Sequence, residues 1–251
     1  DYLEGGDELL ARDAFDEFAR ADYEDVKALK PRMKRDKYLA WVNDPNVPAS
    51  RRRGYFTLLG VCGKSEDADM IRGMLTTPTE EPRTGVDAAL ACYLTLKGEK
   101  GLPFVESMYL ANKDAEYADT YAAVMALRFH GQSENVIANE RLVASLRLLL
   151  NRPDMADLVI PDLARWKDWE SMDRLVELFK KADPKKSWVR IPVVQYLLAC
   201  PLPEAKKRLE ELRKLDEEAV RRASLFLPAG GAGAATQSQD AQPAETPDDA
   251  S

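Results

Sequence analysis

Residues 55–63 read Tyr-Phe-Thr-Leu-Leu-Gly-Val-Cys-Gly, and this stretch decides the fold. Its apolar side chains fall at i, i+3, i+4 and i+7, a spacing that places them on one face of an α-helix. They are Tyr55, Leu58, Leu59 and Cys62. Gly63 follows, and glycine is preferred just after a helix because it enters the left-handed region without a Cβ clash. We therefore expect an amphipathic helix over residues 50–62.

The same organisation recurs along the chain: an apolar helix ends in a small or polar break, and a second amphipathic helix follows. The leading apolar residue of each break lies at position 18, 59, 94, 127, 163 or 197, so the spacings are 41, 35, 33, 36 and 34 residues. A nearly fixed period in this range is typical of repeat proteins, in which each unit packs on the next. Residues 36–42 read as an extra short helix, which explains the longer first spacing.

This period predicts two sets of helices. The first helices of the pairs are expected at residues 8–20, 50–62, 85–97, 117–130, 155–166 and 188–200. The second helices are expected at residues 24–34, 66–76, 100–112, 136–150, 169–182 and 203–214, with a closing helix at 217–227. The only β-like runs, residues 158–160 and 193–194, are short and flanked by helical pattern. The predicted fold is all-α, with about six helix pairs stacked over residues 1–227.

The breaks end their helices in two ways. Gly63, Gly98 and Gly131 are expected to take the left-handed conformation after a helix. Pro201 ends another helix because proline cannot continue the hydrogen-bond ladder. Small residues also recur at equivalent places in three first helices, where they would let neighbouring helices approach closely. They are Gly54, Ala89 and Ala122.

Residues 228–251 form an acidic tail with an abrupt change of composition. A Gly-Gly-Ala-Gly-Ala-Ala run is followed by Gln, Ser, Pro and acids, without an aromatic residue. Such a segment buries too little apolar area to offset the entropy of ordering it. We expect a disordered, solubilising tail, with a docking motif as the alternative.

Charge and hydropathy weigh against some classes of partner. The net charge is −7, of which the tail contributes −4, so the helical part carries −3. An acidic surface is a poor match for nucleic acid or for an anionic membrane. No apolar run approaches the roughly 18–20 residues that span a bilayer. The chain begins Asp-Tyr-Leu-Glu, without Met or a signal pattern, so we expect a mature product or an excised domain.

The three cysteines are far apart, and each lies in an apolar helical context. They are Cys62, Cys92 and Cys200. We expect small buried hydrophobic residues, with one disulfide and a free thiol as the less favoured alternative. No CxxC pair occurs, so a zinc site has no cysteine framework.

Residues 44–60, Asp-Pro-Asn-Val-Pro-Ala-Ser-Arg-Arg-Arg-Gly-Tyr-Phe-Thr-Leu-Leu-Gly, resemble the opening of a HEAT repeat. In that family an Asp-Pro turn leads into an Arg-bearing first helix, and Leu-Gly precedes the second. Residues 87–90 (Asp-Ala-Ala-Leu), 96–98 (Leu-Lys-Gly) and 102–103 (Leu-Pro) are similar. The later repeats keep the spacing but depart from the motif. The resemblance implies a HEAT-like solenoid, that is, a right-handed α-α superhelix.

Residues 11–19, Ala-Arg-Asp-Ala-Phe-Asp-Glu-Phe-Ala, together with residues 48–53, are similar to HEAT-like proteins of planctomycete-type bacteria. In those proteins such a region tends to follow an exported N-terminal β domain. This likeness covers about the first half of the chain. It implies an extracytoplasmic, periplasmic or secreted, origin and no assigned activity.

His130 is the only histidine. It is expected in the last turn of a helix, where a cation or donor interacts favourably with the helix carbonyls, and we predict this capping role for it. A single histidine and no CxxC pair leave a zinc or iron site without its usual ligands. We therefore expect no metal, no cofactor and no catalytic histidine.

Arg51, Arg52 and Arg53, with Arg83, could line one edge of the stack and bind an acidic partner segment. The alternative, implied by HEAT proteins, is that they pair with acids of the same chain. Three bases at a helix N-terminus are electrostatically unfavourable, so that acids should compensate them. The candidates are Asp13, Asp16, Glu17 and Asp44.

Trp166, Trp169 and Trp188 cluster in the sequence. Core filling is the expected role of aromatic residues in a helical stack. The turn at 166–169 is the exception that we single out, because it joins two helices and could expose an indole as an interface anchor. Arg51, Arg52, Arg53, Trp166 and Trp169 are thus the predicted partner-binding residues.

Catalytic patterns are absent from the sequence. The carboxylate clusters Asp13/Asp16/Glu17 and Glu210/Glu211 lie on polar helical faces, and acid–base catalysis needs burial to separate the pKa values of such groups. No GxxxxGK[ST], GxGxxG, GxSxG or HExxH motif is present. We therefore expect no enzyme.

The leading hypothesis is a non-catalytic protein–protein interaction scaffold, monomeric, whose concave surface is built from the second helices and binds a protein or peptide partner. One alternative is a rigid auxiliary domain of a larger exported protein whose activity lies in a missing N-terminal domain. Another is an enzyme resembling the HEAT-like DNA glycosylases, which would require a basic groove with tryptophans. The acidic charge weighs against this third hypothesis, and we expect neither nucleic-acid binding nor membrane insertion.

Overall fold

The computed structural model describes residues 3, 7–77, 84–184 and 188–225, and every regular element within these ranges is a helix. The all-α prediction is thereby confirmed. The two runs with β-like sequence form no strand in the described structure. Residues 158–160 lie where a 3₁₀ turn meets α10, and residues 193–194 lie inside α12. Arg83 and the predicted tail, residues 228–251, lie outside the described residues.

The α-helices have the following bounds: α1 (Glu8–Arg20), α2 (Tyr23–Ala28), α3 (Arg35–Asn43), α4 (Ala49–Cys62), α5 (Asp67–Thr76), α6 (Val86–Lys97), α7 (Leu102–Val105), α8 (Tyr117–Gln132), α9 (Asn139–Arg147), α10 (Ile160–Arg165), α11 (Met172–Lys181), α12 (Arg190–Ala199), α13 (Pro203–Leu215) and α14 (Glu217–Leu225). A π-helical turn, η3 (Glu106–Leu110), continues α7. Short 3₁₀ turns lie at η1 (Lys30–Arg32), η2 (Gly98–Gly101), η4 (Leu148–Asn151), η5 (Ala156–Leu158) and η6 (Trp169–Ser171).

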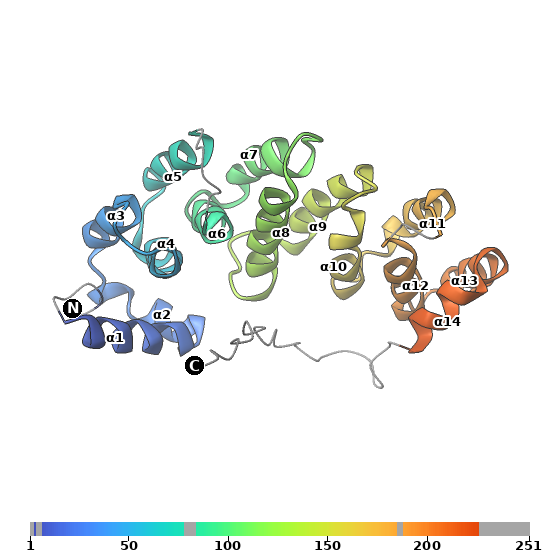
Figure 1. The fold of residues 1–251 in the computed structure, drawn as a ribbon, viewed down its shortest axis with the longest axis horizontal. Coiled ribbons are helices and arrows are strands. Elements are labelled where there is room, and N and C mark those ends of the chain that lie inside the picture. Colours follow the sequence, from blue (N-terminus) through green and yellow to red (C-terminus); the bar gives the residue numbers. More distant parts are fainter. Residues whose placement is uncertain (1–2, 4–6, 78–83, 185–187, 226–251) are drawn as a thin grey trace, which may run out of the picture.

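The helices lie in two rows along a common arc (Figure 1). Helices α4, α6, α8, α10, α12 and α14 follow the inner, concave side, and α3, α5, α7, α11 and α13 follow the outer side. Along the inner row, α4 packs on α6, α6 on α8, α10 on α12, and α12 on α14. The outer helices pack inward, α3 on α4, α5 on α6 and α11 on α12.

The two rows correct the predicted concave surface. This surface was predicted to consist of the second helices. Of those helices, α5, α7, α11 and α13 lie on the outer side, and the first helices from α4 onward face inward (Figure 1). The short helix predicted at 36–42 is present as α3 and packs on α4 as its outer partner. At the start of the arc an outer helix thus precedes the inner helix on which it packs, whereas α12 packs on both α11 and α13, the second of which is its predicted partner.

The predicted breaks are only partly as expected. Gly98 has a positive φ of +61° after α6, which favours glycine, but its ψ of −148° lies outside the predicted left-handed helical region. Gly63 follows α4 with φ −72° instead. Gly131 lies inside α8, which continues to Gln132. A Cβ at Gly131 would lie 2.2 Å from the Trp166 ring, so close packing, and not helix termination, requires glycine there.

Helices α1 and α2 do not stack as a further pair, contrary to prediction. The ring of Phe15 in α1 packs edge-on against Tyr55 of α4, with 6.3 Å between the centroids. The ring of Tyr23 in α2 packs against Phe129 near the end of α8, at 5.0 Å. These helices therefore cross the inner row from α4 to α8, and in Figure 1 they lie beneath it. We call residues 8–28 the N-terminal strap.

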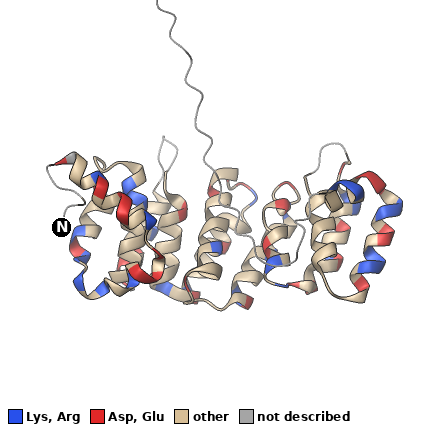
Figure 2. Ribbon diagram, turned by 90° about the horizontal axis from the view of Figure 1, so that it is seen from below, with Lys and Arg blue, Asp and Glu red and all other residues tan. Residues whose placement is uncertain are grey.

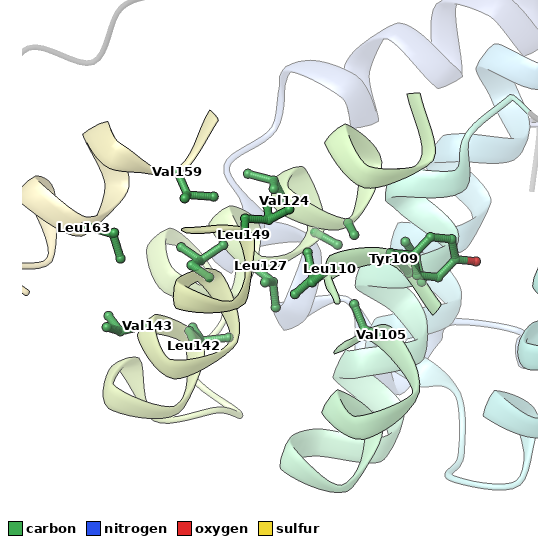
Figure 3. Close-up of a cluster of buried hydrophobic side chains, with 14 of the residues drawn as sticks. Val105, Tyr109, Leu110, Val124, Leu127, Leu142, Val143, Leu149, Val159 and Leu163 are labelled. Atoms are coloured by element: carbon green, nitrogen blue, oxygen red, sulfur yellow. The ribbon is translucent and has the colours of Figure 1, made fainter. Parts of the chain in front are cut away.

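One cluster of buried apolar side chains runs through the described residues from the first helices to Ala223. Figure 3 shows its centre, where Val105 and Leu110 meet Val124 and Leu127 of α8. The apolar side chains of Leu142, Leu149, Val159 and Leu163 continue the cluster toward α10. Cys92 and Cys200 are buried and Cys62 is half-buried, all as free thiols, as the sequence predicts.

Ion pairs join residues about one period apart. Arg53 pairs with Asp87 and Arg128 with Asp162, 34 residues later in each case. Among the second helices, Arg208 pairs with Asp173 over 35 residues at 2.7 Å, and Arg141 pairs with Glu106 at 2.6 Å. The same residue types thus meet across successive units on both rows. None of the described helices is long and apolar enough to cross a membrane.

Candidate functional site

The inner row is hollowed where the N-terminal strap crosses it. A cavity of about 470 Å³ lies between the strap and helices α4, α6 and α8. Its wall is largely apolar, formed by side chains of the strap and of the inner helices. They include Phe15, Phe18, Phe56, Leu58, Met125 and Phe129. This volume is within the range of ligand pockets, which are mostly apolar with a few polar groups.

An ion pair marks the rim of this cavity. Arg53 of α4 donates two parallel hydrogen bonds to the carboxylate of Asp87 in the first turn of α6, both of 2.7 Å. The Arg53 side chain is 51% exposed, so the pair itself adds little to stability. Its bidentate geometry does fix the guanidinium in place.

A second hollow of about 320 Å³ continues from the same ion pair toward the N-terminus of α8. It shares Arg53, Asp87 and Met125 with the first hollow and extends to Tyr121. The exposed ring of Tyr121 stacks on that of Tyr117, with centroids 6.2 Å apart. We call the two hollows together the concave groove.

The three predicted arginines have different surroundings. Arg52 donates to the backbone carbonyls of Asp44 and Val47, both at 2.9 Å, and so holds the turn before α4. Arg53 is the one that lines the concave groove. Arg51 is half-buried. Arg53 pairs with an acid of the same chain, as the intramolecular alternative expects, although that acid, Asp87, was not among the predicted candidates. Arg52 is bound within the chain as well, but by backbone carbonyls and not by an acid.

Trp166 and Trp169 are half-buried and pack against the core, so neither is a fully exposed anchor. Trp166 lies on Gly131, and Trp169 packs edge-on against Tyr196 with centroids 5.2 Å apart. Trp188 is the exposed indole, at 82% of its surface, beside a hollow that also includes Arg174. The turn at 166–169 thus joins helices without exposing a whole ring.

His130 is fully buried and does not cap its own helix, contrary to prediction. Its Nε2 lies 3.1 Å from the carbonyl oxygen of Ala91 in α6, so it links neighbouring inner helices. Nδ1 has no hydrogen-bond partner among the described residues. Burial lowers the pKa of the imidazole, against smaller opposing effects of the Ala91 carbonyl and Glu134. The uncharged ring is therefore favoured, since burial penalises the cation.

Buried carboxylates in the described part of the chain accept from arginines and backbone amides. Asp67 accepts from the Arg35 guanidinium and, at 2.7 Å, from the Lys64 amide. Burial opposes its ionised form, but these donors outweigh burial and lower its pKa. Asp168 likewise accepts from Arg147. These hydrogen bonds to charged groups stabilise the fold.

The other predicted acids lie mainly in solvent. Asp13, Glu17, Glu210 and Glu211 are exposed, and Asp16 is half-buried. Within the described ranges, no group of three or more histidine, cysteine, aspartate and glutamate side chains is arranged to hold a metal ion.

Comparison with protein-family models, with curated proteins and with solved structures found no match to this chain. The HEAT-like resemblance therefore stays a prediction from the sequence. The all-helical fold and the packing between neighbouring helices rest on the structure itself.

Sequence reasoning missed most of the concave groove. Asp87 and Tyr121 were not predicted as site residues, and the strap was predicted as an ordinary repeat. One signal was available, because Asp87 follows Arg53 by 34 residues, one period of the repeat. No comparable sequence signal links Tyr23 to Glu134, since they lie 111 residues apart.

Proposed function

We propose that this chain is a non-catalytic protein-interaction scaffold, a HEAT-like solenoid in which helix pairs stack as a right-handed superhelix. Three features support the stacking: α4 contacts α6, α6 contacts α8, and α10, α12 and α14 follow one another in contact; one apolar cluster runs through the described residues; and ion pairs recur at 34 or 35 residues. Repeat proteins stack in this way because a single helix pair cannot bury its apolar face alone.

The concave groove is the observation that carries the proposed binding function. It combines an apolar floor with an exposed tyrosine pair and a half-exposed arginine along one side of the arc. Tyrosine, arginine and other large side chains that fill well-packed depressions dominate the binding energy of protein interfaces. Of the predicted partner-binding residues, Arg53 lines this groove, and Tyr121, Met125 and Phe129 join it.

Two alternative functions receive different support. The ion pairs across successive units also favour a rigid auxiliary domain, since bidentate pairs fix neighbouring helices in register. Figure 2 views the arc from its concave side and shows basic and acidic residues intermixed along the described helices. Nucleic-acid binding typically uses a continuous basic stripe, so this pattern does not favour the DNA-binding enzyme.

Site-specific photo-crosslinking tests the scaffold proposal. A benzophenone amino acid at Tyr121, in the concave groove, should give discrete protein adducts in extracts of the source cells. The matched control replaces Met108, an exposed apolar residue of η3 at the end of α7 in the outer row. Equal adducts at both positions, or none at Tyr121, would contradict binding through the concave groove.

A further inference from the structure

We propose that the N-terminal strap is a displaceable internal ligand of the concave groove, and that the external partner is an amphipathic helix presenting two large apolar side chains one turn apart. This inference rests on the proposed scaffold function and specifies its partner and its regulation. The strap itself shows this mode of binding, because α1 places Phe15 and Phe18 in the wall of the cavity. Helix-in-groove recognition uses anchors at this i, i+3 spacing.

The strap docks at a place shaped for an aromatic ring. A Cβ at Gly54 of α4 would lie 2.6 Å from Cε2 of Phe15, so that only glycine leaves room for the ring. The same ring packs edge-on against Tyr55, and the Tyr55 hydroxyl donates to the Leu3 carbonyl at 3.1 Å. Helix α4 thus carries a built contact for a helix that lies across it.

The strap fills the concave groove incompletely. A hollow of about 470 Å³, partly open to solvent and lined mostly by apolar side chains, remains between it and the inner helices. Helix α1 has one fully buried residue, Ala11, while α6 buries six of its twelve residues. Elements with few buried apolar contacts open locally at low free energy. A helix with bulkier anchors would fill this space better than the strap does.

A small polar latch holds the far end of the strap. The Tyr23 hydroxyl donates to the Glu134 carboxylate at 2.7 Å, and the Tyr23 ring packs on Phe129. The Lys27 ammonium lies 5.2 Å from the centre of the same ring. The opposite face of the strap carries the exposed side chains of Leu9 and Leu10. The strap is thus joined to α8 through few side chains, and its apolar residues are divided between two faces.

The test uses the full chain and a fluorescent synthetic peptide of residues 7–28 as the probe. The variant Phe15→Ala/Phe18→Ala weakens the docking of the strap, so the groove should be open more often. The apparent affinity of a site rises in proportion to the fraction of molecules in which it is free, and we expect the peptide to bind at least about tenfold more tightly than to the native chain. Fluorescence anisotropy measures this difference.

Two matched controls accompany this experiment. The variant Leu9→Ala/Leu10→Ala removes two apolar side chains from the same helix on its exposed face, and it should bind the peptide as the native chain does. A peptide that carries alanine at both phenylalanine positions should bind neither protein. Equal affinity of the native chain and the Phe15→Ala/Phe18→Ala variant, both with the same helical circular dichroism, would overturn the proposal.

Hydrogen exchange on the unaltered chain supplies a second measurement that needs no variant. Amides of α1 and α2 should exchange on the order of a hundredfold faster than those of α6, because the strap opens without global unfolding. Equal protection in the strap and in α6 would show that the strap is part of the core and would overturn the proposal. If crosslinks form at Tyr121 but the strap proves undisplaceable, the scaffold proposal survives and this one fails.

Discussion

The environment of His130 predicts how stability responds to acid. Burial lowers the pKa of its imidazole below the ordinary value of 6.5, although the Ala91 carbonyl and Glu134 oppose the shift. The unfolded chain therefore binds a proton at a higher pH than the folded protein does. The contribution of the neutral imidazole to the free energy of unfolding is fully present above about pH 6.5. It is lost as the pH falls below this value, by at most about 1.4 kcal/mol per pH unit for one proton.

Urea unfolding at pH 7.5, 6.5 and 5.5 checks this prediction. Native protein should lose more stability over this range than a His130→Gln variant, which has no titratable group at that position. Because both proteins keep all other acids and bases, the difference between their two pH profiles isolates the histidine. Parallel profiles would show that His130 titrates alike in the folded and unfolded chains.

Lys167 is a residue whose replacement should stabilise the protein. It has φ +58°, and the hydrogen bonds from the Asp168 amide to Leu163 and from the Lys167 amide to Ala164 form a Schellman motif after α10. Glycine is preferred at this position because a side chain in the left-handed region strains the backbone by about 1–2 kcal/mol. After allowing for the greater flexibility of unfolded glycine, Lys167→Gly should gain roughly 0.5–1 kcal/mol.

The control for this substitution is Lys167→Ala, which removes the exposed lysine side chain but keeps a Cβ at positive φ. Its free energy of unfolding should remain close to that of the native protein. If alanine and glycine stabilise the protein equally, the lysine side chain, and not the backbone conformation, is the unfavourable feature.

At the scale of the helix, two glycines should respond in opposite ways to replacement by alanine. In α8, a Cβ at Gly131 would meet the Trp166 ring at 2.2 Å. Gly131→Ala should therefore lower the free energy of unfolding by about 1–3 kcal/mol, as overpacking of this kind does. In α5, a Cβ at Gly73 meets nothing within 4 Å, so Gly73→Ala should gain roughly 0.5–1 kcal/mol from the better helix propensity of alanine.

Chemical denaturation of the two single variants decides this prediction. The variant Gly131→Ala/Trp166→Leu adds a test of cause, since a smaller side chain at position 166 should recover part of the loss. If Gly131→Ala proves as stable as the native protein, α8 and α10 are packed less closely than the structure indicates.

Helix bounds could be predicted where the apolar spacing is regular, but not at residues 155–166, where α10 begins only at Ile160, and helix partners could not be predicted. The apolar spacing of α4 and α6 is local, so that each was predicted to within one residue at both ends. Gly131 was predicted to end its helix, because a glycine after an apolar stretch looks the same in the sequence whether it ends a helix or not. Its actual role depends on its contact with Trp166, 35 residues away. The N-terminal strap also has ordinary helical patterning. Its contact with Glu134 is set by tertiary packing alone.

The candidate site was predicted in part for the same reason. The arginine run pointed to Arg53, because basic residues at a helix N-terminus require compensation. Which acid compensates Arg53 depends on which helices lie side by side on the concave side, and that side is formed by the other row of helices than the sequence predicts. Tyr121 belongs to the groove only because α8 follows the inner side (Figure 1).

At the scale of the whole molecule, α8 and α10 are joined by an ion pair whose carboxylate is buried. Arg128 donates to the Asp162 carboxylate at 2.9 Å and to the Leu158 carbonyl at 2.8 Å. The Asp162 side chain is 1% exposed, and an uncompensated buried charge is strongly destabilising. The variant Arg128→Met should therefore lower the free energy of unfolding by about 3 kcal/mol. This is the low end of the range for a buried ion pair, because Arg165 still pairs with Asp162 at 3.0 Å.

This loss should weaken the coupling between the two halves of the arc, because Arg128 and Asp162 join α8 and α10 near its middle (Figure 1). We expect calorimetry of Arg128→Met to resolve two unfolding transitions where the native protein shows one. The matched control is Arg53→Met, which breaks an ion pair of the same 34-residue spacing whose arginine is 51% exposed. That variant should lose less than about 1 kcal/mol and keep one transition, since exposed pairs are screened by water. Equal losses with a single transition in both variants would place the weakest interface elsewhere in the stack.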